Sequence, residues 1–288
     1  MKPLIIGTRG SPLARAQVEI IRALLRQANP ALPVEVKIIK TTGDNLVDVS
    51  LSAAGGKGLF TKEIEEHLLA GEIHVAVHSL KDLPTILPEG LTIGAVPARE
   101  DARDVFLSKK YRSLDELPTG ARVATGSVRR RAQLLARRPD LRIEEVRGNV
   151  GTRLEKLPNF DGMILAAAGL KRLGLDVTYQ PLDVSVMIPA VGQGAIACEV
   201  RENDFATQEA LAVINDAGTL ACVEAERVFL RVLGGGCQVP YAANATIEGN
   251  ELRLLGAVFE PRLRKTEVRG PKSDPLSVGE RAANEIKG

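Results

Sequence analysis

The chain has 288 residues, of which 44% are hydrophobic, and a formal net charge of +2. This length is enough for two or three domains with separate cores, and the small net charge does not favour a general polyanion binder. No stretch approaches the roughly 18 apolar residues that span a bilayer, and the first apolar run is too short for a signal peptide. We therefore expect a cytoplasmic protein with no membrane partner.

The first hundred residues alternate between strand and helix patterns. Ser11 is placed to cap a helix whose first residue is Pro12, and Arg9 precedes it in the same turn. The free backbone N–H groups at such a helix start make this turn a candidate anion site. The alternation predicts an α/β domain with a largely parallel sheet and ligand groups at the carboxyl ends of its strands. Strands are expected at residues 4–6, 34–39 and 73–77, and helices at 12–28 and 62–70.

Positive charge is concentrated between residues 121 and 153, which contain nine arginines and no lysine. A guanidinium group binds carboxylate or phosphate through two parallel hydrogen bonds, which an ammonium group cannot do. This preference predicts a ligand with several acidic groups. Three of the arginines are interpreted as a solvated helix face, namely Arg137, Arg138 and Arg142.

Two patterns of the first half recur in the second. The serine, arginine, alanine and glutamine of residues 11–17 return with the same spacing at 127–133, after a strand expected at 122–124, and residues 75–82 are echoed at 165–172. The repetition predicts two domains of similar topology, with their ligand turns facing each other across a cleft and hinges near 97–99 and 189–194. The first domain is expected to comprise residues 1–97 with 194–215, and the second residues 98–193.

The remaining residues, 216–288, predict a small α+β domain. A helix over 219–233 ends in a glycine run, and three strands of an antiparallel sheet are expected at 241–247, 251–259 and 263–268, followed by a closing helix. Cys237 follows three glycines, which leave its thiol open to a bulky group and indicate an attachment point. Cys198 and Cys222 are expected to be buried, reduced side chains. The three histidines and three cysteines form no pattern that indicates a metal site.

Nine stretches, in this order, resemble the porphobilinogen deaminase family, and the resemblance runs from about Ile5 to the C-terminus. They are GTRGSPLA at 7–14, GGKGLFTKE at 55–63, AVHSLKD at 76–82, REDARD at 99–104, SVRR at 127–130, RGNVGTR at 147–153, AAGLKRLG at 167–174, PAVGQG at 189–194 and GGCQVP at 235–240. The expected fold is two similar doubly wound domains, like those of type II periplasmic binding proteins, around a cleft, plus the small third domain.

The resemblance implies a transferase that joins four porphobilinogen molecules head to tail, releases ammonia and yields hydroxymethylbilane. It also implies a dipyrromethane cofactor, held through a thioether for which Cys237 is the matching residue. Each pyrrole carries an acetate and a propionate, which accounts for a need for many arginines. The substrate is then a small molecule, with no nucleic-acid partner, and a monomer is expected.

Asp82 is the catalytic residue that the resemblance implies. Loss of ammonia leaves an azafulvenium cation, which a fixed carboxylate near the ring nitrogen stabilises, and the same group can help to move protons. His78 is expected in the core or behind the site rather than as a base. The implied cofactor-binding residues, besides Cys237, are Lys81, Thr125, Ser127, Arg129, Arg130 and Arg147. The implied substrate-binding residues are Arg9, Ser11, Lys57, Arg147, Arg153 and Arg172, with Lys57 on a glycine-rich flap.

Two other functions are weighed against this one. Two α/β domains around a hinged cleft are also the plan of a non-enzymatic binding protein for an acidic small ligand, but such a protein has no need of Asp82 or of a thioether cysteine. A nucleic-acid-binding domain built on residues 121–153 is disfavoured by the net charge of +2 and by an aromatic content of 3%.

Overall fold

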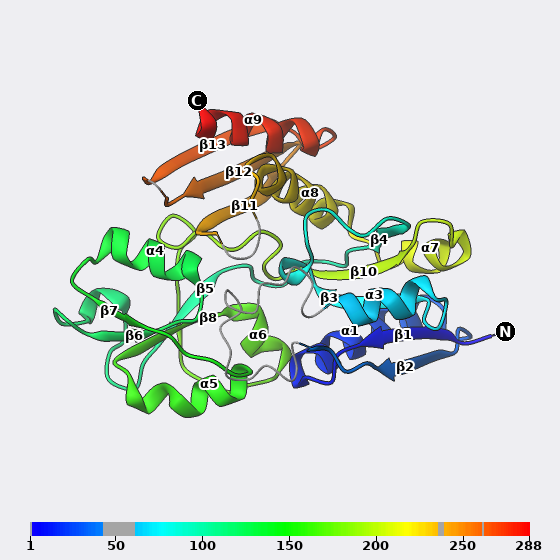
Figure 1. Cartoon of the computed structure of the whole chain (residues 1–288), viewed down its shortest axis with the longest axis horizontal. Helices are drawn as coiled ribbons and strands as arrows, with labels where there is room; N and C mark the ends of the chain where they lie inside the picture. The colour runs from blue at the N-terminus through cyan, green and yellow to red at the C-terminus, as the bar shows by residue number, and fades with distance from the viewer. Residues whose placement is uncertain (1, 43–60, 236–238, 261) are drawn as a thin grey trace. The chain divides into compact units, whose positions relative to one another are not determined.

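The computed structural model describes residues 2–42, 61–235, 239–260 and 262–288 (Figure 1). The chain forms two compact units. The first comprises Met1–Arg99 and Ala195–Leu220, and the second comprises Glu100–Gly194 and Ala221–Gly288. The chain passes between the units three times, after Arg99, Gly194 and Leu220, and the first two passages lie at the segments where the sequence predicts hinges.

The first unit contains a five-stranded sheet of order β2-β1-β3-β10-β4. Strand β1 pairs in parallel with β2 and β3, whereas β10 is antiparallel to both β3 and β4. Four strands thus run one way and one runs against them, which confirms the predicted largely parallel sheet. The strands are β1 (Leu4–Thr8), β2 (Val34–Ile38), β3 (Val75–Ser79), β4 (Leu91–Ala95) and β10 (Ile196–Arg201).

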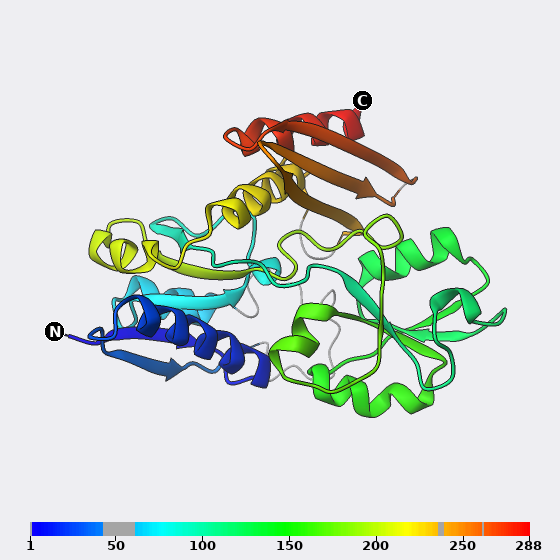
Figure 2. The same ribbon diagram turned by 180° about the vertical axis from the view of Figure 1, so that it is seen from behind.

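Helices cover both faces of this sheet, α1 on one and α3 on the other (Figure 1 and Figure 2). Alternate residues of a strand point to opposite faces, so Val75 and Val77 pack in the α1 core and Ala76 packs in the α3 core. The helices are α1 (Pro12–Ala28), α3 (Lys62–Leu69), α7 (Phe205–Ala212) and the short 3₁₀ helix η1 (Leu80–Asp82). The predicted bounds of the first helix are confirmed.

The second unit repeats this plan in a sheet of order β7-β6-β8-β5-β9. Strand β6 is parallel to β7 and β8, and β5 is antiparallel to β8 and β9. The order and directions match those of the first sheet strand for strand, which confirms two domains of similar topology. The elements are β5 (Asp104–Leu107), η2 (Leu114–Glu116), β6 (Arg122–Ala124), α4 (Val128–Arg137), β7 (Arg142–Glu144), α5 (Val150–Lys156), η3 (Leu157–Asn159), β8 (Gly162–Ala166), α6 (Ala167–Arg172) and β9 (Gln180–Pro181).

A three-stranded antiparallel sheet of order β11-β12-β13 completes the second unit. Its core contains Phe229 of α8, Leu254 of β12 and Val278 of α9. The elements are α8 (Ala217–Val232), β11 (Tyr241–Glu248), β12 (Glu251–Val258), β13 (Arg264–Pro271) and α9 (Pro275–Lys287). The predicted antiparallel sheet and closing helix are confirmed. Because the second unit holds both sheets, the division into three domains stays a prediction.

Gly194 ends the first segment of the second unit in a conformation that favours glycine, with a φ of +87°. A methyl group at this position would lie 2.4 Å from the carbonyl oxygen of Glu100. The Gly194 carbonyl accepts hydrogen bonds from the Glu100 backbone N–H at 3.1 Å and from Arg172 Nη2 at 2.6 Å. Because Gly194 has no side chain, its backbone can pack closely against the backbone of Glu100.

Replacing Gly194 by alanine should lower the free energy of unfolding by at least about 2 kcal/mol, because backbone strain and a steric clash add. The control is Gly174→Ala, where φ is +60° but no atom lies within 4 Å. The control should cost only about 1 kcal/mol of strain. Urea unfolding followed by far-ultraviolet circular dichroism measures both, and equal losses would show that the close contact at Gly194 is unimportant.

Candidate active site

The turn after β1 carries the first predicted ligand residues, Arg9 and Ser11. Both are half-buried. The Ser11 side chain accepts a hydrogen bond from the Ala14 backbone N–H at 3.3 Å, which confirms its predicted role as the cap of α1. The first turn of this 17-residue helix offers backbone N–H groups, and Arg9 lies in the turn just before it, so both can attract an acidic ligand.

Asp82 and Lys81 follow β3, on η1. Leu80, at the start of η1, is buried, and its backbone N–H donates to the Ala195 carbonyl at 3.1 Å. Asp82 is exposed and Lys81 half-buried. Strands β1 and β3 are parallel neighbours, so their carboxyl ends lie at one edge of the sheet. The first unit therefore places the carboxylate of Asp82 at the same edge as the Arg9–Ser11 turn.

The second unit builds a corresponding turn after β6, with Thr125 and Ser127. The Ser127 side chain accepts from the Arg130 backbone N–H at 3.4 Å and so caps α4. The Thr125 hydroxyl oxygen accepts from the Ser127 backbone N–H at 3.2 Å. Both hydroxyl oxygens act as acceptors in these contacts, which leaves each O–H able to donate to a ligand.

Arg129 and Arg130 of α4 converge on the carboxylate of Asp104. Nη2 of Arg129 lies 2.8 Å from Asp104 Oδ2, and Nη2 of Arg130 lies 2.8 Å from Oδ1. Gln193 Nε2 also donates to Asp104 Oδ1, at 2.8 Å. All three ionic side chains are at least nine-tenths buried. The sequence assigned both arginines to a ligand but overlooked Asp104, which the structure makes their common partner.

The electrostatics of this cluster leave an excess of positive charge, since two guanidinium groups share one carboxylate. Burial alone would raise the pKa of Asp104, but Arg129 and Arg130 lower it to about 2. Burial, together with the like charge of Arg130, lowers the pKa of Arg129, although Asp104 opposes the change. Among the described residues, the cluster is thus cationic and suited to a further anion.

Three other predicted arginines follow β7 and β8, the strands on either side of β6. Arg153 Nε donates to the Gly148 carbonyl at 2.8 Å, and Arg147 forms an ion pair with Glu145. Arg172 is half-buried; burial lowers its pKa, and the charge of Glu100 opposes this. Strands β7, β6 and β8 are parallel neighbours. The second unit therefore gathers its predicted site residues at one edge of its sheet.

Family models match almost the whole chain. Residues 4–209 match the model described as "Porphobilinogen deaminase, dipyromethane cofactor binding domain", and residues 220–288 match "Porphobilinogen deaminase, C-terminal domain". The chain belongs to the porphobilinogen deaminase family. It is a transferase of tetrapyrrole biosynthesis whose larger matching region is the one that binds the dipyrromethane cofactor.

Curated porphobilinogen deaminases are similar over nearly their full length. One from Acidithiobacillus ferrooxidans (strain ATCC 53993 / BNL-5-31) is 51% identical over 282 residues, covering 96% of this chain and 92% of the relative. One from Geobacillus sp. (strain WCH70) is 50% identical over 291 residues, covering 98% and 93%. With such relatives, the alternative of a non-enzymatic binding protein is not favoured.

Solved structures to which the chain is similar include a periplasmic substrate-binding protein of an ABC transporter from Coxiella burnetii, at 15% identity and a TM-score of 0.47, with 78% of this chain and 96% of that one covered. The methionine-binding protein MetQ has 14% identity and a TM-score of 0.46, with coverages of 72% and 87%. The two five-stranded sheets of this chain, β2-β1-β3-β10-β4 and β7-β6-β8-β5-β9, correspond strand for strand, as the predicted pair of similar α/β domains requires.

Two predicted site residues, Cys237 and Lys57, lie outside the described residues, so their roles stay predictions. The other two cysteines are described. Cys198 is fully buried, and burial raises the pKa of its thiol to about 12. Cys222 is buried as well. The prediction that both are buried small side chains is confirmed, and a thiol as buried as Cys198 is a poor nucleophile.

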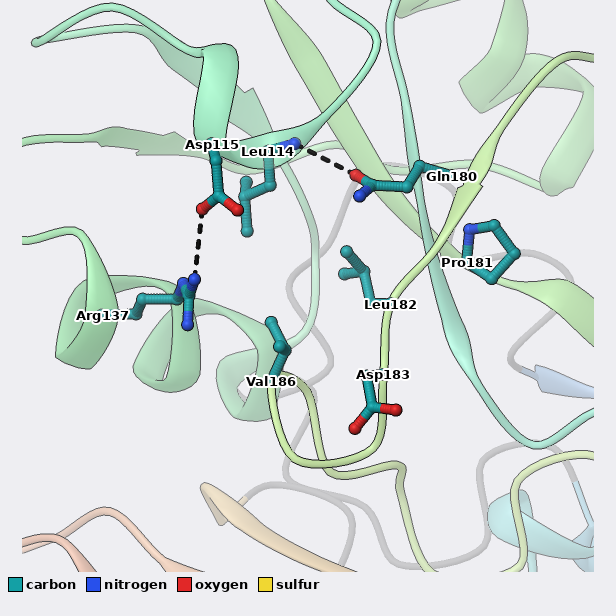
Figure 3. Close-up of a pocket in the computed structure, with 8 residues that line it drawn as sticks. All are labelled: Leu114, Asp115, Arg137, Gln180, Pro181, Leu182, Asp183 and Val186. Carbon is teal, nitrogen blue, oxygen red and sulfur yellow. Dashed lines mark hydrogen bonds and ion pairs between the residues drawn. The ribbon is translucent and has the colours of Figure 1, made fainter.

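Figure 3 shows a pocket of about 180 Å³ in the second unit. The Gln180 side chain accepts from the Leu114 backbone N–H at 3.1 Å beside it, and Arg137 pairs with Asp115 at 3.2 Å. None of the predicted site residues lines this pocket, which is formed by Leu114, Asp115, Arg137, Gln180, Pro181, Leu182, Asp183 and Val186. The exposed ion pair of Arg137 is in keeping with its interpretation as part of a solvated face.

Within the described residues, no helix is long and apolar enough to cross a membrane.

Proposed function

We propose that Asp82 is the catalytic carboxylate of this hydroxymethylbilane synthase, which joins four porphobilinogen molecules head to tail with release of ammonia. The observation that carries the proposal is the exposed Asp82 carboxylate, held at the carboxyl end of β3 with Lys81 beside it. The cationic turn at Arg9 lies at the same edge of the sheet. A fixed negative charge and nearby groups for acidic ligands are both required by this reaction.

Asp82 stabilises positive charge as it develops on the substrate. When the aminomethyl group loses ammonia, the remaining charge spreads over the pyrrole ring, and a carboxylate near the ring nitrogen lowers the energy of that state. The same carboxylate can accept a proton from the pyrrole carbon that forms the new bond, and can hold a proton for the departing amine. Because Asp82 is in a 3₁₀ turn anchored by Leu80, its carboxylate needs little reorganisation.

The residues of the second unit fit a cofactor with several carboxylates. The Asp104 cluster has two guanidinium groups for one carboxylate, so an acidic group of the ligand would balance its charge. Dipyrromethane, when bound, supplies the terminal pyrrole from which the product chain grows. The residues that would hold its acidic groups are Lys81, Thr125, Ser127, Arg129, Arg130 and Arg147, with the covalent bond at Cys237.

The carboxylates of the substrate are proposed to bind to a second set of cationic side chains and to the N-terminus of α1. Arg9 and the capped N-terminus of α1 together offer a charged fork and backbone donors. The partial burial of Arg172 strengthens its interaction with an acidic group, because the local dielectric constant is low. The full set is Arg9, Ser11, Lys57, Arg147, Arg153 and Arg172.

We also propose that the enzyme acts as a cytoplasmic monomer and binds no nucleic acid. The absence of tryptophan and the net charge of +2 support the second point. Light scattering during size-exclusion chromatography should give the mass of one chain, and a gel shift with duplex DNA at about 0.15 M salt should show no complex. A dimer mass or a retarded band would overturn the corresponding statement.

The intact mass of the denatured protein tests the cofactor site. The parent should carry extra mass equal to two linked pyrrole units, whereas Cys237→Ser should carry none. Cys222→Ala is the matched control, because it removes another cysteine and should keep the extra mass. If the parent carries none even after incubation with porphobilinogen, the proposal is wrong, because a cofactor-free enzyme should acquire pyrrole mass and a binding protein should not.

A further inference from the structure

Three ionisable side chains meet in the interior of the first unit, on the α3 side of its sheet. They are His78 of β3, Glu199 of β10 and Glu65 of α3, with exposed fractions of 6%, 0% and 7%. Nε2 of His78 lies 3.2 Å from Oε2 of Glu199. The reaction proposed above uses none of them. Burying three such groups is costly, so their retention calls for an explanation.

Several polar atoms of this cluster lack a hydrogen-bond partner among the described residues. They are Nε2 of His78, both carboxylate oxygens of Glu199 and Oε1 of Glu65. Burial raises the pKa of Glu65, the charge of Glu199 raises it further, and Thr61 and His78 oppose the change. Glu65 is therefore influenced by the charges of both Glu199 and His78 in the interior of the first unit.

The cluster lies directly behind the segment that carries Asp82. Residues of β3 alternate between the two faces, so His78 points with Ala76 toward α3 and Ser79 points toward α1. On the α1 face, Gln17 Nε2 donates to Ser79 Oγ at 2.8 Å. On the α3 face, the His78 side chain of β3 contacts the Glu199 carboxylate of β10. The last two residues of β3 are thus held from both sides immediately before η1 begins.

We propose that the buried contact of His78 with Glu199, beside Glu65, fixes the end of β3, which makes His78 a positioning residue for Asp82. This inference rests on the proposed role of Asp82. The charged groups facing His78 are Glu199 from β10 and Glu65 from α3. The next charge along β10, Arg201, is bonded to the carbonyls of Leu68 and Ile73 and to the carboxylate of Asp204.

The test compares His78→Gln, Glu199→Gln and the double variant. His78→Gln should lower kcat by about tenfold to hundredfold, with a much smaller change in KM, because Asp82 is displaced rather than removed. It also leaves two buried carboxylates without an imidazole. Burial and the charge of Glu199 raise the pKa of Glu65, and the imidazole no longer opposes this change. The stability contributed by a carboxyl group with a raised pKa is present at low pH and lost as pH rises, so the unfolding midpoint of this variant should fall between about pH 5 and pH 8 more than that of the parent.

Replacing Glu199 by glutamine in the same chain removes one of the two carboxylates. The double variant should therefore unfold at a higher urea concentration than His78→Gln at pH 8, and the two single effects should not add. His67→Gln is the matched control. This histidine lies half-exposed beside Glu72 on the same unit, and its replacement should leave kcat unchanged.

Additive effects on unfolding would overturn the coupling of His78 with Glu199, and an unchanged kcat in His78→Gln would overturn the positioning role. These outcomes are separable from a failure of the proposed function. If Asp82→Asn kept full turnover, Asp82 would not be catalytic, whereas the coupling of His78 with Glu199 in unfolding would still report on the cluster itself.

Discussion

Asp82→Asn should lower the turnover of porphobilinogen by about 10²-fold to 10³-fold, the loss expected when one fixed electrostatic group is removed from a reaction site. Asparagine has nearly the shape of aspartate but carries no charge and accepts no proton. The side chain is exposed on η1, so the substitution should leave the fold intact. The loss should appear mainly in kcat, because the charge on the ring exists only after ammonia departs.

Ammonia release and product formation are measured together with the intact mass of each protein. The variant should keep the cofactor mass, which separates a defect in catalysis from a failure to assemble the cofactor. Asp176→Asn serves as the control, since it makes the same chemical change at an exposed aspartate of the second unit. Turnover within about threefold of the parent would contradict the catalytic role of Asp82.

Asp104→Asn should lower the free energy of unfolding by about 3–5 kcal/mol, the range for breaking a buried ion pair. Its carboxylate pairs with both Arg129 and Arg130 inside the second unit, and both partners are at least nine-tenths buried. With asparagine in its place, two like charges remain buried next to each other. The repulsion and the lost hydrogen bonds act in the same direction.

The pH dependence of stability follows from the pKa of Asp104, which is lowered from 3.8 to about 2. A carboxyl group with a lowered pKa contributes its stability fully above the ordinary value and loses it as pH falls toward the folded value. The parent should therefore lose this contribution between about pH 4 and pH 2, and Asp104→Asn should lack that part of the acid limb.

Urea unfolding of both proteins between about pH 2 and pH 7 measures these effects. The matched control is Asp115→Asn. Asp115 also pairs with an arginine of α4, Arg137, at 3.2 Å, but the Asp115 side chain is 71% exposed. An exposed pair contributes about 0–1 kcal/mol, so the control should be nearly neutral. Losses of similar size in the two variants would show that the Asp104 cluster is not a buried ionic centre.

Much of the local structure could be predicted because its signals are short-range. Ser11 and Pro12 mark the start of α1, and the N-cap hydrogen bond to Ala14 is present. The repeated pattern at Ser127 marks α4 in the same way. One strand was placed early: the sequence predicts β3 from Ile73, but the strand begins at Val75, because the backbone N–H of Ile73 bonds instead to the His67 carbonyl at 3.4 Å.

The partners of the buried charges could not be predicted. Asp104 stands in a segment with two other acidic residues, Glu100 and Asp101, and nothing local shows that it alone is enclosed by the α4 arginines. Glu226 reads as an ordinary helix residue, yet its carboxylate is fully buried and accepts from the backbone N–H groups of Gly192 and Ala245, both at 2.7 Å. Each of these contacts joins residues that lie 19 or more positions apart.

The sequence by itself determined the repeated α/β plan, the candidate catalytic Asp82 and the candidate attachment residue Cys237, because periodicity, caps and ordered motifs depend on neighbouring residues. Only the tertiary structure decided which of the predicted arginines are buried against Asp104 and which remain accessible. It also decided that His78 shares its surroundings with Glu65 and Glu199. The physical reason is that burial and charge pairing depend on which strands and helices become neighbours in space, and short sequence patterns do not encode that.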